Sequence, residues 1–160
     1  MKDMGIFSEC LAKGKTGEQL WAQILKNIGA EDIEFNDDGR YDISCLLNGK
    51  TVTYEVKTDF NTIRTQNVAV EFSSRGRKSG IITSNAKYWV YLIDRAFYLI
   101  DAQKLKKYVL NRDMELDIKT SVDGNLIYLI PLGDFKKITV FVTSDAHQEI
   151  TKNKVGISWY

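Results

Sequence analysis

The dipeptide Asn48-Gly49 is the feature that most constrains how this chain can fold. It lies between two segments, 41–47 and 51–58, in which apolar and polar residues alternate. An Asn-Gly pair between such segments favours a two-residue type I′ turn, because both residues tolerate a positive φ. A two-residue loop also sets the register, since a slip by one residue would turn every side chain to the other face. The sequence therefore predicts a tight antiparallel hairpin over residues 41–58.

Counting outward from this turn predicts which residues face one another across the hairpin. Ile43 pairs with Tyr54, and the next step places Asp42 opposite Glu55. Directly opposed Cβ atoms lie about 4.5–5.5 Å apart, so two like charges there destabilise the sheet. Lys57 follows Glu55 by two residues and points to the same face. Either this face is solvated and Lys57 neutralises the acids, or the two carboxylates are oxygen ligands for a divalent cation such as Mg²⁺.

A helix is predicted upstream of the hairpin, from residue 17 to residue 28. Thr16 is its expected N-cap, and Gly29 is its expected C-terminal stop. The apolar residues recur at helical spacing and form one stripe: Leu20, Trp21, Ile24, Leu25 and Ile28. Glu18 lies in the first turn at the edge of this stripe, so it lies near the sheet if the stripe packs there. Interaction with the helix dipole is an equally good explanation for a first-turn glutamate.

The remaining pattern predicts one α+β domain spanning residues 1–160, with a mixed, antiparallel-rich sheet. Strands are expected at 32–36, 68–72, 89–93, 97–100, 126–130 and 138–142, and a helix at 102–110. Residues 61–66 are read as a helical turn or a loop, 73–80 as a basic loop, and 148–160 as a segment of uncertain structure. Trp89 and Tyr91 are more typical of sheet packing than of base stacking.

Composition narrows the functional classes. The 160 residues include 22 basic and 21 acidic side chains, a net charge of +1, so any nucleic-acid binding must come from local basic clusters. Two cysteines, expected to be reduced thiols, and one histidine, His147, argue against a zinc site and a histidine-centred catalytic triad. The sequence has no apolar run of about 18–20 residues and no export signal, so we expect a cytoplasmic protein with no membrane partner. No small-molecule cofactor is expected.

The ordered set of Glu18 on a helix, Asp42 on a strand and Glu55-Val56-Lys57 on the paired strand resembles the PD-(D/E)XK nuclease superfamily. The helix glutamate is most similar to the Holliday-junction resolvase branch and its phage and archaeal relatives. The resemblance covers roughly residues 17–58. It departs from the motif where Tyr41, and not proline, precedes the aspartate. It implies a restriction-endonuclease-like α/β/α fold with the N-terminal helix packed on a mixed sheet.

The resemblance also implies an activity, Mg²⁺-dependent hydrolysis of DNA phosphodiester bonds, with Mn²⁺ as a substitute. On these positions, Asp42, Glu55 and the carbonyl of Val56 would bind metal, and Glu18 would bind it directly or through water. Lys57 would orient or help deprotonate the attacking water and stabilise charge on the phosphate; we favour the electrostatic role.

The resemblance leaves more than one DNA substrate open. The substrate is branched junction DNA cut by a homodimer, or a duplex site as in restriction-like and homing endonucleases. A phage-encoded enzyme would act in the host cytoplasm. The alternatives from other classes are a non-catalytic nucleic-acid-binding module of the same fold and an interaction protein with a solvated charged hairpin.

Further polar residues are candidates for contacts with the nucleic acid or the metal, each with a plain structural alternative. The basic candidates are Lys13, Lys15, Arg75, Arg77 and Lys78, which are otherwise solvated surface charges. Gln66 and Asn67 contact phosphate or form a turn, and the turn is favoured. Glu71 is a further acidic ligand or an exposed strand residue, and the strand residue is favoured.

Overall fold

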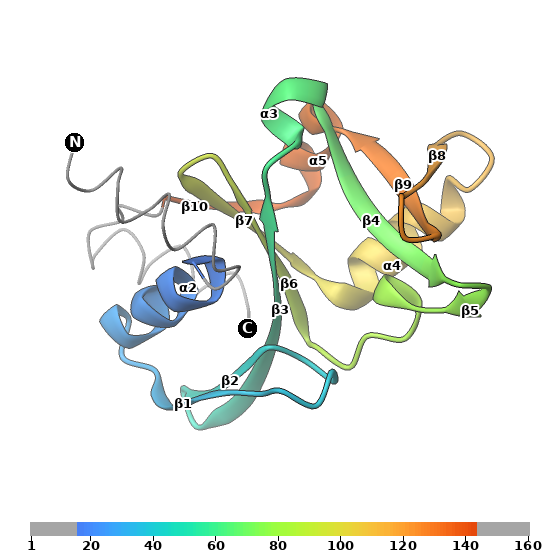
Figure 1. Ribbon diagram of the computed structural model, residues 1–160. Helices are drawn as coiled ribbons and strands as arrows, with labels where there is room; N and C mark the ends of the chain where they lie inside the picture. The colour runs from blue at the N-terminus through green and yellow to red at the C-terminus, as the bar shows by residue number, and fades with distance from the viewer. Residues whose placement is uncertain (1–15, 144–160) are drawn as a thin grey trace.

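The computed structural model describes residues 16–143 and shows an α+β fold built on two sheets (Figure 1). The larger sheet has six strands in the order β1-β2-β3-β6-β7-β10. Its β3 and β6 are parallel, and all its other neighbours are antiparallel. The strand bounds are β1 (Glu31–Phe35), β2 (Ile43–Leu47), β3 (Lys50–Asp59), β6 (Tyr88–Ile93), β7 (Ala96–Asp101) and β10 (Val140–Thr143).

The smaller sheet is antiparallel and has four strands in the order β5-β4-β9-β8. These are β4 (Asn67–Ser74), β5 (Arg77–Lys78), β8 (Asp117–Thr120) and β9 (Asn125–Pro131). The helical elements are α2 (Thr16–Asn27), α3 (Thr62–Thr65), η1 (Gly80–Ile82), α4 (Ala102–Asn111) and α5 (Leu132–Ile138). The predicted α+β class, with a mixed sheet and a helix packed on it, is confirmed.

No helix within residues 16–143 has the length and apolar character needed to cross a membrane.

Helix α2 covers one face of the larger sheet because its apolar stripe matches the alternation of the strands. Trp21 and Leu25 are fully buried, and the Trp21 ring packs edge-on against Tyr54 at 5.6 Å between ring centroids. Val52, Tyr54 and Val56 of β3 belong to this first core. The helix ends at Asn27, one residue before the predicted end, and the predicted stop Gly29 has φ +92°. It begins at Thr16, so the residue predicted as the N-cap is the first helical residue.

The opposite face of the larger sheet forms a second core with the smaller sheet, α4 and α5. Trp89 and Tyr91 of β6 project into it, where Tyr91 packs edge-on against Phe135 of α5 at 5.0 Å. The Tyr91 hydroxyl donates a hydrogen bond to the Ala69 carbonyl of β4 at 3.0 Å. This bond joins the two sheets, so the strand that flanks β3 also sets the position of the smaller sheet.

The predicted hairpin is confirmed in register and in turn type. Ile43 pairs with Tyr54 and Leu47 with Lys50, and the residues between them pair in step. Asn48 has φ +51° and Gly49 has φ +77°, as a type I′ turn requires.

Three parts of the chain differ from the sequence prediction. Residues 73–80 are not a loop throughout, because β4 continues to Ser74 and a turn at Arg75-Gly76 leads into β5. Helix α5 and strand β8 were not predicted. Strand β8 is exposed at every residue, so it has no buried face to produce an alternating pattern. Residues 61–66, left open between helical turn and loop, contain the short helix α3.

The first turn of α2 lies directly on β3 at the residue that follows Lys57. A Cβ atom added to Gly17 would lie 2.3 Å from Thr58 Oγ1 and 3.3 Å from Val56 Cγ1. Both neighbours are β-branched side chains with little rotational freedom. Glycine at position 17 is therefore what lets the helix, and Glu18 with it, approach the strand so closely.

We expect Gly17→Ala to lower the free energy of unfolding by about 1–3 kcal/mol, the usual cost of overpacking, as measured by urea denaturation. Gly133→Ala in α5 is the matched control, because a Cβ there meets nothing within 4 Å. The control is expected to be neutral or slightly stabilising. Equal stability of the two variants would contradict the close approach of α2 to β3.

Candidate functional site

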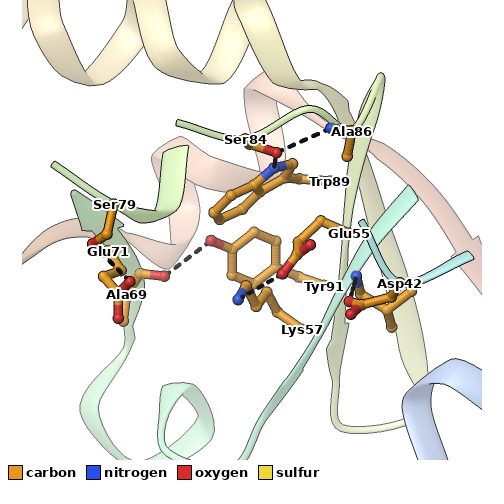
Figure 2. A network of polar contacts seen from close by, with 11 residues as sticks. Asp42, Glu55, Lys57, Ala69, Glu71, Ser79, Ser84, Ala86, Trp89 and Tyr91 are labelled. Carbon is orange, nitrogen blue, oxygen red and sulfur yellow. Dashed lines mark hydrogen bonds and ion pairs between the residues drawn. The ribbon is translucent and has the colours of Figure 1, made fainter. Parts of the chain in front are cut away.

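Strand β3 presents two faces of opposite chemistry, and the candidate site lies on the one turned away from α2. Glu55 and Lys57 alternate with the buried Tyr54 and Val56, so they point toward the second core. The parallel pairing with β6 places Glu55 beside Trp89 and Lys57 beside Tyr91 on that face. The two charged side chains therefore lie against an aromatic wall and not in open solvent (Figure 2).

The Lys57 ammonium lies between an acid and an aromatic ring. Its Nζ is 3.1 Å from Glu55 Oε1 and 5.1 Å from the centroid of the Trp89 ring, a cation–π distance. The indole itself is held in place, because Trp89 Nε1 donates to Ser84 Oγ at 2.9 Å. The Glu55 side chain is only 20% exposed and that of Lys57 41% exposed, so solvent screens this pair less than a surface ion pair.

Asp42 is not paired directly with Glu55, although the hairpin register predicted this pairing. The regular ladder between β2 and β3 ends at Ile43 and Tyr54 and does not extend to an Asp42–Glu55 pair. Instead, the Asp42 amide donates to the Tyr54 carbonyl at 2.9 Å, and Asp42 Oδ2 accepts the Val56 amide at 2.7 Å. The carboxylate therefore accepts a hydrogen bond from the β3 backbone, which stabilises its negative charge.

The three predicted acids nevertheless share one electrostatic environment. The pKa of Glu55 is raised above its ordinary value, chiefly because the side chain is buried, and Asp42 and Glu18 raise it further. Lys57 lowers the pKa of Glu55, but by less than burial and the two acids raise it. Glu18, from the helix on the other face of the sheet, thus lies close enough to influence an acid on β3. Perturbed carboxylates of this kind concentrate at functional sites, although structural ion pairs produce them too.

The arrangement does not by itself complete a metal centre. Within residues 16–143, no three acidic, histidine or cysteine side chains converge closely enough to hold a metal ion. Glu55 is paired with Lys57, and one Asp42 oxygen is bound by an amide. The Val56 side chain is buried in the first core, so this residue can contribute only its backbone. Any ion here would need water or substrate oxygens besides the carboxylates, which is common for Mg²⁺.

The other predicted acidic and amide candidates have local structural partners. Glu71 lies on the smaller sheet, where its carboxylate accepts a hydrogen bond from the Ser79 hydroxyl at 2.9 Å. Gln66 caps α3 in a left-handed conformation, and its side chain donates to the Ile63 carbonyl. The Asn67 side chain donates to the Thr65 carbonyl. The favoured interpretation of Gln66 and Asn67 as turn residues agrees with these contacts, and Glu71 is not among the groups that shift Glu55.

The described basic candidates lie on the smaller sheet and not on β3. Arg75, Arg77 and Lys78 are exposed at the tip of the β4–β5 hairpin, at the outer edge of the smaller sheet (Figure 1). Lys13 and Lys15 lie outside the described residues.

Sequence reasoning missed a cleft that begins at Lys57. It has a volume of about 390 Å³ and lies between the end of β3, α3 and the smaller sheet. Phe60, Arg64 and Lys119 contribute to its lining. Lys119 is far from β3 in sequence and belongs to an unpredicted strand, so no local pattern connects it with Lys57. In the sequence, only the aromatic Phe60 directly after the alternating strand hinted at it.

Comparisons of this chain with protein-family models, with curated proteins and with solved structures found no match.

We expect Asp42→Asn to lower the pKa of Glu55, because the substitution removes a neighbouring negative charge. Glu18→Gln should lower it by less, since Glu18 has the smaller effect on this group. The measurement is an NMR titration of the Glu55 carboxyl carbon. Glu71→Gln is the matched control and should leave the Glu55 titration unchanged. An unchanged pKa in Asp42→Asn would show that the acids do not form one site.

Proposed function

We propose that this protein is a metal-dependent DNA endonuclease of the PD-(D/E)XK type. The observation that supports the proposal best is the partly buried Glu55–Lys57 pair on β3, where burial and, to a smaller extent, Asp42 and Glu18 raise the pKa of Glu55. A buried carboxylate that two other acids destabilise is unfavourable for folding, whereas a divalent cation at the same place would remove the penalty. The adjacent Lys57 supplies a cationic group that can stabilise the charge developing on the phosphate.

The residues present fit Mg²⁺ or Mn²⁺ as the ion. Asp42 and Glu55 offer hard carboxylate oxygens, the Val56 carbonyl is the expected backbone ligand, and Glu18 would act directly or through water. When bound, the ion lowers the pKa of a water molecule and polarises the phosphoryl oxygen. In this scheme Asp42 keeps its hydrogen bond to the Val56 amide through one oxygen and leaves the other for the ion.

Lys57 has the electrostatic role in the proposed reaction. Its ammonium is held 3.1 Å from Glu55 and over the Trp89 ring, so it remains close to the place where the phosphate would lie. From there it can orient the attacking water and stabilise the negative charge that develops on the phosphate oxygens. The Trp89–Ser84 hydrogen bond fixes the ring under Lys57 and so limits the positions open to the ammonium.

A branched DNA substrate and a homodimeric enzyme remain part of the proposal by analogy with the resolvase branch. A restriction-like or homing activity on duplex DNA is the alternative within the same chemistry. The non-catalytic nucleic-acid-binding module is the second candidate. The observation in its favour is that Asp42 and Glu55 already have an amide and an ammonium as partners within the described part of the chain.

We expect the purified protein to cut supercoiled, single-stranded or four-way-junction DNA with Mg²⁺ or Mn²⁺. Lys57→Met should reduce the cleavage rate by about 10²–10³-fold, the usual effect of removing one charge-stabilising group. Glu55→Gln should abolish detectable cleavage. Lys50→Met, at the turn end of the same strand, is the matched control and should cut at the wild-type rate. The absence of cleavage of every DNA form with both ions would reject the enzyme.

We also expect Mn²⁺ to stabilise the wild-type protein against thermal unfolding. At about ten times the dissociation constant, a ligand that binds only the folded state adds about 1.4 kcal/mol, which corresponds to a rise of roughly 3–6 °C in Tm for a chain of this size. Glu55→Gln should show no rise at the same concentration. A non-catalytic binding module would bind DNA in EDTA, with equal Tm values in Mn²⁺ and in EDTA.

A further inference from the structure

The cleft beside Lys57 is large enough to hold part of a substrate. Its volume of about 390 Å³ falls at the lower end of the range of ligand pockets. It therefore has room for a nucleotide but not for two paired strands. It is reached from solvent past Phe60 and Arg64, which are both exposed. Because Lys57 is one of its lining residues, anything bound in the cleft lies against the proposed catalytic lysine.

The charge of the cleft favours an anionic occupant. Three cationic side chains line it, Lys57 from β3, Arg64 from α3 and Lys119 from β8. The only acidic residue among the lining residues is Asp59. One oxygen of Asp59 accepts the backbone amides of Asn61 and Thr62, at 2.9 Å and 2.7 Å. Asp59 is therefore bound to the start of α3, and Lys57 is paired with Glu55, so the positive charge available to a ligand comes from Arg64 and Lys119.

The rest of the lining is mixed: Thr58, Asn61, Thr65 and Asn67 are polar, and the other residues are apolar or aromatic. Ala69, Ile127 and Leu129 of the smaller sheet line one side. Tyr91 is also a lining residue, and its hydroxyl is bound to the Ala69 carbonyl, so its polar end already has a partner. Phe60 is 59% exposed, so its ring is accessible to a ligand in the cleft. A groove that combines cations with an exposed aromatic side chain matches the chemistry of single-stranded nucleic acid.

We propose that this cleft binds an unpaired nucleotide of the substrate strand, with its base against Phe60 and its backbone phosphates on Arg64 and Lys119. Resting on the proposed nuclease function, this inference names the substrate class as DNA with a single-stranded segment next to the bond that is cut. Base faces are covered by stacking within an intact duplex, so such DNA would need a junction, a flap or an extruded base to enter. The side chains at Arg75, Arg77 and Lys78 are not required for this contact.

The test is the binding of fluorescently labelled oligothymidylate in EDTA, measured by anisotropy at several salt concentrations. Phe60→Ala should weaken binding roughly tenfold, because a stacked base contributes about that much to affinity. Lys119→Ala should weaken binding and reduce the salt dependence by about 0.7, the slope expected for one phosphate of a single strand. Phe60 and Lys119 are exposed, so both variants should fold, and thermal unfolding verifies this.

Matched controls separate a specific cleft from general charge and surface effects. Phe35→Ala removes a phenylalanine of similar exposure, 55%, from β1, and Lys104→Ala removes an exposed lysine from α4. Both should bind oligothymidylate as the wild type does. Equal losses in the controls, or an affinity for fully paired duplex equal to that for the single strand, would overturn the assignment of the cleft.

The two proposals fail in different ways. Binding that depends on Phe60 and Lys119, without cleavage in Mg²⁺ or Mn²⁺, rejects the nuclease and supports the cleft. Cleavage that depends on Glu55 but is unaffected by Phe60→Ala and Lys119→Ala, on both single-stranded and duplex DNA, supports the nuclease and rejects the cleft. Where both proposals are correct, Phe60→Ala should raise KM for single-stranded DNA and change kcat little.

Discussion

Strand β3 lies between the two cores of the protein, and each candidate site residue is placed by its relation to this strand. The side chains at Val52, Tyr54 and Val56 bind the strand to α2 through buried apolar contacts. The alternate side chains are free to be charged because they point to the other face, where Trp89 and Tyr91 of the parallel neighbour β6 flank them. The same alternation thus stabilises the fold on one face and exposes ionisable groups on the other.

The electrostatics of the site carry a cost for folding. Burial together with Asp42 and Glu18 disfavours the charged form of Glu55, and the Lys57 ion pair offsets only part of this effect. A charged hairpin face that served only solubility would lie in solvent, where neighbouring acids interact weakly. Glu55 is instead partly buried beside Trp89, so solvent screens its interactions with neighbouring charges less. Local arrangements that reduce stability in this way are expected at functional sites.

The site and the cleft differ in how they are built. The acids and Lys57 come from the first helix and the hairpin, which are close in sequence, and Gly17 brings the helix onto the strand. The cleft forms only where α3 turns the chain from β3 into β4, and where β8 and β9 return to lie beside β4. The hydrogen bond from the Tyr91 hydroxyl to the Ala69 carbonyl then joins the two sheets beside the cleft. The catalytic proposal therefore depends on local structure, and the substrate proposal depends on long-range packing.

Local patterns were enough to predict the hairpin register, the helix stripe and the shared face of Glu55 and Lys57, because turn chemistry and residue periodicity act over a few neighbours. They were not enough for Asp42, whose carboxylate binds the Val56 amide where the ladder ends, nor for residues 73–80, where a tight turn at Arg75-Gly76 continues the strand. Residue alternation along the chain is enough to set which side chains share a face of β3. Tertiary structure decided what that face meets, since the pairing with β6 and the position of Lys119 join residues that are far apart along the chain.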